Sequence, residues 1–235
     1  MAIEAIKFEE WLRVLKHPFS VVPFNRGVDR SLAMDFTEKN TLLTADTVSN
    51  IDLFTNYIDT TLQTAKALYG IGGYNELRSV YSRSEVFDGV EGKEPRRLHL
   101  GIDIWGAAGT FVLAPLTGKV HSFAFNKAYG DYGATIILEH TISGGSFYTL
   151  YGHLSLDSIT HIEVGNEIKQ QQVFAHFGIP EENGYWPPHL HFQLILDMQG
   201  YVGDYPGVCA YSEREKYLAN CPDPDLLIGM MKFAK

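Results

Sequence analysis

Residues 189–196 read HLHFQLIL, and the regular alternation of side chains in this stretch indicates a β-strand. Because successive side chains of a strand point to opposite faces, the apolar residues would all face a core. The two histidines, His189 and His191, would then lie side by side on the other face. The stretch therefore predicts both a β-rich domain and a strand face that carries imidazoles.

Similar short runs, separated by glycine-rich turns, occupy the chain on the N-terminal side of this stretch. Further candidate strands are residues 99–105, 110–115, 118–125, 134–140, 146–153 and 173–178. Many short strands with regularly spaced turn signals are typical of antiparallel sheets. We expect an antiparallel β-sandwich or a partly closed barrel.

The flanking regions are predicted to be helical. Apolar residues recur at helical spacing from Phe8 to Leu15, with an end at His17-Pro18, and again between Ile51 and Leu68, where Gly70 would cap the helix. A short helix is expected near residues 211–219. The fold class is therefore predicted to be α+β, comprising a helical N-terminal region (1–92), a β domain (93–206) and a helical tail (207–235).

Composition narrows the range of partners and compartments. The 235 residues include 19 Lys and Arg against 28 Asp and Glu, a net charge of −9, which disfavours nucleic acids and anionic membranes as partners. We find no apolar run of the roughly 20 residues that a membrane span needs. The first residues are acidic where a secretory leader would be basic and then apolar, so we expect a cytoplasmic protein, or a periplasmic or extracellular one if a leader has been removed.

Two further motifs carry polar groups suited to metal chemistry. In a strand over residues 99–105, His99 and Asp103 would share one face with only Gly101 between them, and His153 ends another candidate strand. Zinc sites in hydrolases use three His or carboxylate ligands and leave a fourth position for water. His99, Asp103 and one histidine of the HxH pair could supply that set, although other divalent ions accept the same ligands.

Taken together, HxxxD, then Y-x-H-L, then HxHF resemble the motifs of the lysostaphin/LytM-type zinc peptidases, in the order of that family. The resemblance spans roughly residues 96–197. It implies that His99, Asp103 and His191 bind Zn²⁺ and that His153 and His189 are the catalytic pair. It further implies a compact antiparallel β domain that hydrolyses peptide bonds, most often in peptidoglycan.

The chain departs from the family pattern in places close to these motifs. The bulky residues 185–188 (YWPP) replace a small Ser/Thr-Gly step, and Gln193 stands where an acidic residue is common. We expect these departures to affect substrate choice and to touch no ligand or catalytic histidine. Tyr74 and Tyr81 are candidate hydroxyl donors to a substrate, with a purely structural role as the alternative.

The sequence thus predicts a zinc metallopeptidase that cleaves a peptide or peptidoglycan fragment through a metal-activated water. Two alternatives stay open on the same fold. One is a non-catalytic module that binds a peptide or a partner, and the other is a cytoplasmic amide hydrolase of small molecules. The spacing does not distinguish His153 from His189 as the general base, and it does not specify an oligomeric state or whether the N-terminal region covers the metal.

Overall fold

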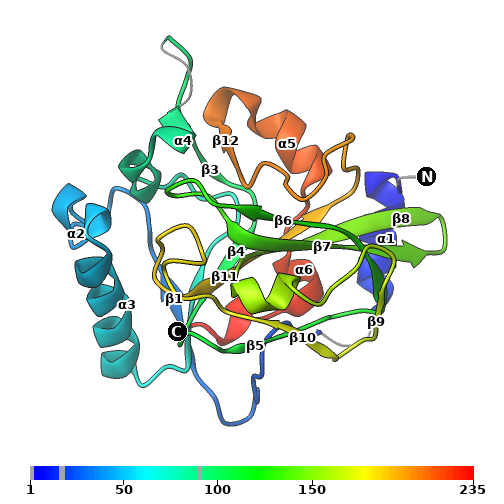
Figure 1. Ribbon diagram of the computed structural model, residues 1–235, viewed down its shortest axis with the longest axis horizontal. Coiled ribbons are helices and arrows are strands. Elements are labelled where there is room, and N and C mark those ends of the chain that lie inside the picture. The colour runs from blue at the N-terminus through cyan, green and yellow to red at the C-terminus, as the bar shows by residue number, and fades with distance from the viewer. Residues whose placement is uncertain (1–2, 16–18, 89–91) are drawn as a thin grey trace.

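A computed structural model describes residues 3–15, 19–88 and 92–235, and the predicted α+β class is confirmed (Figure 1). Its centre is one open sheet of eight strands in the order β1-β2-β4-β11-β8-β7-β6-β9. All neighbours are antiparallel except β1 and β2. In sheet order the strands are β1 (Ser31–Met34), β2 (Tyr69–Gly72), β4 (Ile102–Trp105), β11 (His189–Ile195), β8 (Gly145–Leu154), β7 (Gly133–Ile142), β6 (Gly118–Asn126) and β9 (Glu167–Ile168).

Two smaller sheets complete the β structure. One pairs β5 (Phe111–Leu113) with β10 (Val173–His176), and the other pairs β3 (Arg96–His99) with β12 (Val208–Ala210). The strand predicted over residues 99–105 is therefore wrong in one respect, because the chain leaves β3 after His99, bends at Gly101 and enters β4 in a different sheet. His99 and Asp103 consequently do not share the face of one strand.

The alternation predicted for residues 189–196 is confirmed in β11. Leu190, Phe192 and Leu194 are fully buried in the main apolar core. Burying side chains of this size contributes about 1.5–3 kcal/mol each, so this face of β11 holds the strand firmly in the middle of the sheet. The histidines of β11 are thereby fixed on its opposite face.

The helices lie around the sheet. Figure 1 shows α2 (Ala45–Ser49) and α3 (Ile51–Ala65) on one side of the molecule and α1 (Ala5–Val14) on the opposite side. The remaining helices are α4 (Glu85–Asp88), α5 (Arg214–Asn220) and α6 (Asp225–Ile228), with short 3₁₀ turns at Val80–Arg83, Leu156–Ile159, Tyr211–Glu213 and Met231–Phe233. Among the residues described, no helix combines the length and the apolar character needed to cross a membrane.

The N-terminal region contributes more than helices. Helix α3 ends at Ala65 and is capped by Lys66, which adopts the left-handed conformation (φ 51°), whereas the predicted cap Gly70 lies within β2. Strands β1 and β2 were not expected, yet β2 pairs directly with β4 of the β domain. The end predicted for the first helix at His17-Pro18 lies outside the described residues, and the boundary at residues 92 and 93 stays a prediction.

Candidate metal centre

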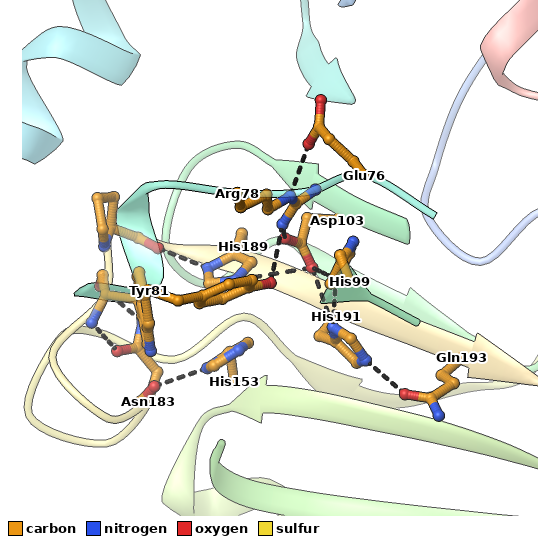
Figure 2. Close-up of polar contacts among 12 residues, drawn as sticks. Glu76, Arg78, Tyr81, His99, Asp103, His153, Asn183, His189, His191 and Gln193 are labelled. Carbon is orange, nitrogen blue, oxygen red and sulfur yellow. Dashed lines mark hydrogen bonds and ion pairs between the residues drawn. The ribbon is translucent and has the colours of Figure 1, made fainter. Parts of the chain in front are cut away.

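Three side chains named by the sequence analysis converge on one point. They are His99 at the end of β3, Asp103 in β4 and His191 in β11, all buried (Figure 2). Nε2 of His99 lies 3.0 Å from Nδ1 of His191 and 3.3 Å from Oδ1 of Asp103. The third side of this triangle, from His191 Nδ1 to Asp103 Oδ1, measures 3.1 Å.

Strand register and one glycine bring these groups together. His191 is the direct partner of Asp103 in the β11–β4 pairing. The bend at Gly101 returns His99 to the same place, and it requires glycine because a Cβ there would lie 2.6 Å from two atoms of the His191 ring. The lack of a side chain at Gly101 matters because the residue packs closely against β11.

The surroundings of the two imidazoles decide which ring nitrogen carries the hydrogen. Nδ1 of His99 lies 2.9 Å from the carbonyl oxygen of Gly73, and Nε2 of His191 lies 2.9 Å from Oε1 of Gln193. A carbonyl oxygen accepts only from an N–H, so these outer nitrogens donate. In the neutral rings, His99 Nε2 and His191 Nδ1 therefore turn lone pairs toward the Asp103 carboxylate.

With both rings neutral, three electron-pair donors face one another with no hydrogen between them. Burial lowers the pKa of His99 to about 4, so this ring is neutral at neutral pH. Burial alone would raise the pKa of Asp103, but the positive charge of the neighbouring Arg78 holds it well below its ordinary value. Tetrahedral zinc ligands at about 2.0–2.1 Å stand about 3.3–3.4 Å apart, close to the separations seen, so the donor set fits such a cation.

His153 of β8 and His189 of β11 lie beside this cluster (Figure 2). Their rings stack with centroids 4.1 Å apart. Nδ1 of His153 donates to the Asn183 carbonyl at 2.7 Å, and Nδ1 of His189 donates to the Pro187 carbonyl at 2.8 Å. Each ring therefore keeps an unprotonated Nε2, and that of His189 lies 4.0 Å from Asp103 Oδ1.

Both of these rings are neutral for the same reason. Burial lowers the pKa of His189 to about 4 and that of His153 well below its ordinary value. His189 is also held by stacking on Trp105, with ring centroids 3.8 Å apart. The arrangement provides two oriented bases next to three metal-ligand candidates.

A cavity of about 250 Å³ opens beside these groups. Asp103, His153, His189 and His191 all contribute to its wall, together with aromatic side chains that include Tyr81 and Trp186. Of the two tyrosines considered from sequence, Tyr81 thus lines the cavity, whereas the Tyr74 hydroxyl donates to the Cys221 carbonyl at 2.6 Å. Water and a substrate carbonyl have room next to the converging donors.

The expectation that the family departures touch no ligand or catalytic histidine is wrong. Gln193 contacts the His191 ring, because residues two apart in a strand share a face. Pro187 holds His189, and the Trp186 ring lies 6.2 Å from that of His153 and 6.3 Å from that of His189. These residues belong to the wall and support of the site.

Two further residues of the site were missed by sequence reasoning. The guanidinium of Arg78 donates through Nη1 to Asp103 Oδ2 and through Nε to Glu76 Oε2, the latter at 2.6 Å (Figure 2). Arg78 precedes Asp103 by 25 positions and belongs to no metal-ligand motif. A single arginine in a polar stretch gives no signal from which this contact could have been inferred.

Comparison with known proteins bears directly on this region. Residues 97–201 match the family described as peptidase family M23, which confirms the resemblance to the lysostaphin/LytM-type peptidases. Among curated proteins, none matches the chain significantly.

Solved structures similar to this chain include three peptidases. A putative peptidase M23 from Pseudomonas aeruginosa is 23% identical over 56% of this chain and 44% of its own, with a TM-score of 0.38, so the match spans less than half of that protein. The catalytic domain of lysostaphin from Staphylococcus simulans is 23% identical, over 69% of this chain and 97% of its own, with a TM-score of 0.40. A zinc-containing peptidase from Vibrio cholerae is 27% identical over 52% of this chain and 31% of its own, with a TM-score of 0.37.

Proposed function

We propose that this protein is a zinc-dependent metallopeptidase, because residues 97–201 match peptidase family M23. The observation that carries the proposal is the convergence of His99 Nε2, Asp103 Oδ1 and His191 Nδ1 within 3.3 Å of one another, next to a cavity whose wall includes Asp103 and His191. A buried set of acceptors that face one another is unfavourable without a cation between them. We propose peptides of the peptidoglycan type as substrates, on the strength of the family motifs.

His99, Asp103 and His191 would hold the metal. Two imidazoles and one carboxylate suit zinc better than magnesium or calcium, which prefer oxygen ligands alone. When bound, zinc supplies a nucleophilic water at neutral pH and polarises the scissile carbonyl. The remaining chemistry belongs to side chains of the protein.

His153 and His189 can move the protons of the reaction. Both residues line the cavity, and because each Nδ1–H donates to a backbone carbonyl, each Nε2 is unprotonated. One ring accepts the proton of the attacking water, and a protonated ring can then donate to the leaving amine. The carbonyl oxygens of Asn183 and Pro187 hold both rings in place while they change charge.

Two substitutions in one strand separate metal binding from turnover. His189→Ala should retain stoichiometric zinc and lose peptide release, whereas His191→Ala should lose both. His161→Ala, at an exposed histidine, is the matched control and should behave as wild type. Zinc content is measured on the purified proteins, and products are measured by mass spectrometry after incubation with peptidoglycan fragments and with a panel of dipeptides, with and without chelator.

The outcomes discriminate between the proposals. Stoichiometric zinc in His191→Ala would remove this residue from the ligand set. Zinc-loaded wild-type protein that releases no product from either substrate class would favour the non-catalytic binding module. Release from small dipeptides alone would favour the small-molecule amide hydrolase.

A further inference from the structure

Arg78 is a buried cation at the edge of the metal centre. Its side chain is only 1% exposed, and every polar contact that it makes is internal. Besides Asp103 and Glu76, the guanidinium contacts the Tyr81 hydroxyl at 3.2 Å and the Gly73 carbonyl at 3.3 Å. It also lies 5.1 Å from the centre of the Phe36 ring. A long cationic side chain is rarely buried this completely unless its charge is paired.

The contact between Arg78 and Asp103 gives the two oxygens of the Asp103 carboxylate different partners. Oδ2 accepts from Arg78 Nη1, and Oδ1 faces His99 and His191. An unrestrained carboxylate could rotate or offer both oxygens to a cation. Here the planar guanidinium fixes the carboxylate so that a single oxygen completes the three-point donor set.

Glu76 keeps the electrostatic balance favourable for a dication. An isolated pair of Arg78 and Asp103 would be neutral and would attract a metal weakly. Glu76 contributes a second negative charge, only 2.6 Å from the Nε of Arg78, so the three groups together remain anionic. The guanidinium can therefore orient Asp103 without cancelling its attraction for a cation.

The same segment of chain also holds the second ligand. The Gly73 carbonyl accepts from His99 Nδ1 at 2.9 Å. The backbone N–H of His99 donates to the Glu76 carbonyl, and the His99 carbonyl accepts from the backbone N–H of Asn75, at 2.9 Å each. Residues 73–78 therefore support two of the three ligand candidates. They lie outside the part of the chain that matches the peptidase family, residues 97–201.

We propose that Arg78, backed by Glu76, is a positioning residue that restricts Asp103 to metal binding through Oδ1. The proposal rests on the proposed function in so far as the metal site is real, but it does not require hydrolysis. Arg78 acts through Asp103 and is not assigned a contact with substrate.

Zinc affinity and coordination geometry test this proposal without an activity assay. Affinity is measured by competition with a chromophoric chelator, and geometry by the visible absorption of the protein loaded with Co²⁺. Arg78→Met should lower zinc affinity about 10–100-fold and alter the Co²⁺ spectrum, because loss of a hydrogen-bond partner that orients a metal ligand has effects of this size. Arg78→Lys retains the charge but cannot bridge Asp103 and Glu76 as a fork, so it should recover part of the affinity.

Two further variants complete the set. Glu76→Gln should weaken zinc binding in the same direction as Arg78→Met. Arg97→Met is the matched control, since Arg97 is a partly exposed arginine of β3 that pairs with Asp88. It should leave affinity and spectrum unchanged.

The results separate this proposal from the previous one. Wild-type affinity and an unchanged Co²⁺ spectrum in Arg78→Met would overturn the role of Arg78 and leave the peptidase proposal intact. If that variant does not fold, the same outcome in both Arg78→Lys and Glu76→Gln would overturn it. Zinc-binding wild-type protein without hydrolysis, combined with weakened binding in the Arg78 variants, would support this proposal and contradict only the peptidase function.

Discussion

Replacing Gly101 by alanine is the most direct perturbation of the bend that brings His99 back to β11. The new Cβ would lie 2.6 Å from Cε1 and Nε2 of His191 and 2.8 Å from the backbone oxygen of Phe192. Ordinary contact begins at 3.4 Å, so the His191 ring or the bend has to move by about 0.8 Å. Metal–ligand distances tolerate only about 0.2 Å, so the donor triangle cannot survive this displacement unchanged.

We expect Gly101→Ala to lower zinc affinity at least tenfold, equivalent to about 1.4 kcal/mol or more. Overpacking should also destabilise the metal-free protein by about 1–3 kcal/mol. Chelator competition gives the first quantity and urea unfolding without metal gives the second. Gly27→Ala is the matched control, because a Cβ at this exposed glycine meets only Oδ1 of Asn25, at an ordinary contact distance of 3.5 Å. Wild-type zinc affinity in Gly101→Ala would refute the close-packing argument.

Two further outcomes are expected. Gln193→Leu should weaken zinc binding about 10–100-fold because the Nε2–H of His191 loses its acceptor, whereas Gln193→Glu keeps an acceptor and should not weaken it. Equal zinc affinities of Gln193→Leu and the wild-type protein in chelator competition would contradict this. Burial lowers the pKa of His140 to about 4 against 6.5 in the unfolded chain, so protons bind preferentially to the unfolded state between these values. As the pH drops from 6.5 to 4, the free energy of unfolding should therefore fall by up to about 3 kcal/mol more in the wild-type protein than in His140→Gln. Above pH 7 the two proteins should show no such difference. Urea unfolding of the metal-free proteins measures both.

Most strands of the β domain were predictable because apolar side chains recur in them at every second position or in short runs. Strands β6 and β11 alternate in this way, whereas β7 and β8 are buried almost throughout and were predicted from apolar runs bounded by turns. The pairing of His99 with Asp103 was predicted for a wrong reason, since the chain bends between them and joins two sheets. Strands β1 and β2 were missed because four-residue segments carry too little periodicity to stand out beside a long helix.

Predictability within the site follows the same division. The five polar residues of the motifs were found because their chemistry is rare and their spacing is regular. Arg78 and Glu76 were not found because their contact with Asp103 is set by tertiary structure. The Gly73 carbonyl could not be found at all, because every residue carries a carbonyl group and only the fold shows which one meets His99.

Strand β11 lies between β4 and β8, although it follows both of them in the chain. During synthesis both neighbours of β11 therefore leave the ribosome before β11 does. Until β11 follows, the edges of β4 and β8 that will face it have no strand to pair with. His191 emerges 88 residues after Asp103, which at translation speeds of about 5–20 residues per second leaves an interval of about 4–18 s. Strand β11 joins the two halves of the sheet and also carries His191, the last of the three ligand candidates to be made. A newly made chain therefore completes its donor set only when β11 also covers the two strand edges that could pair with another chain and aggregate.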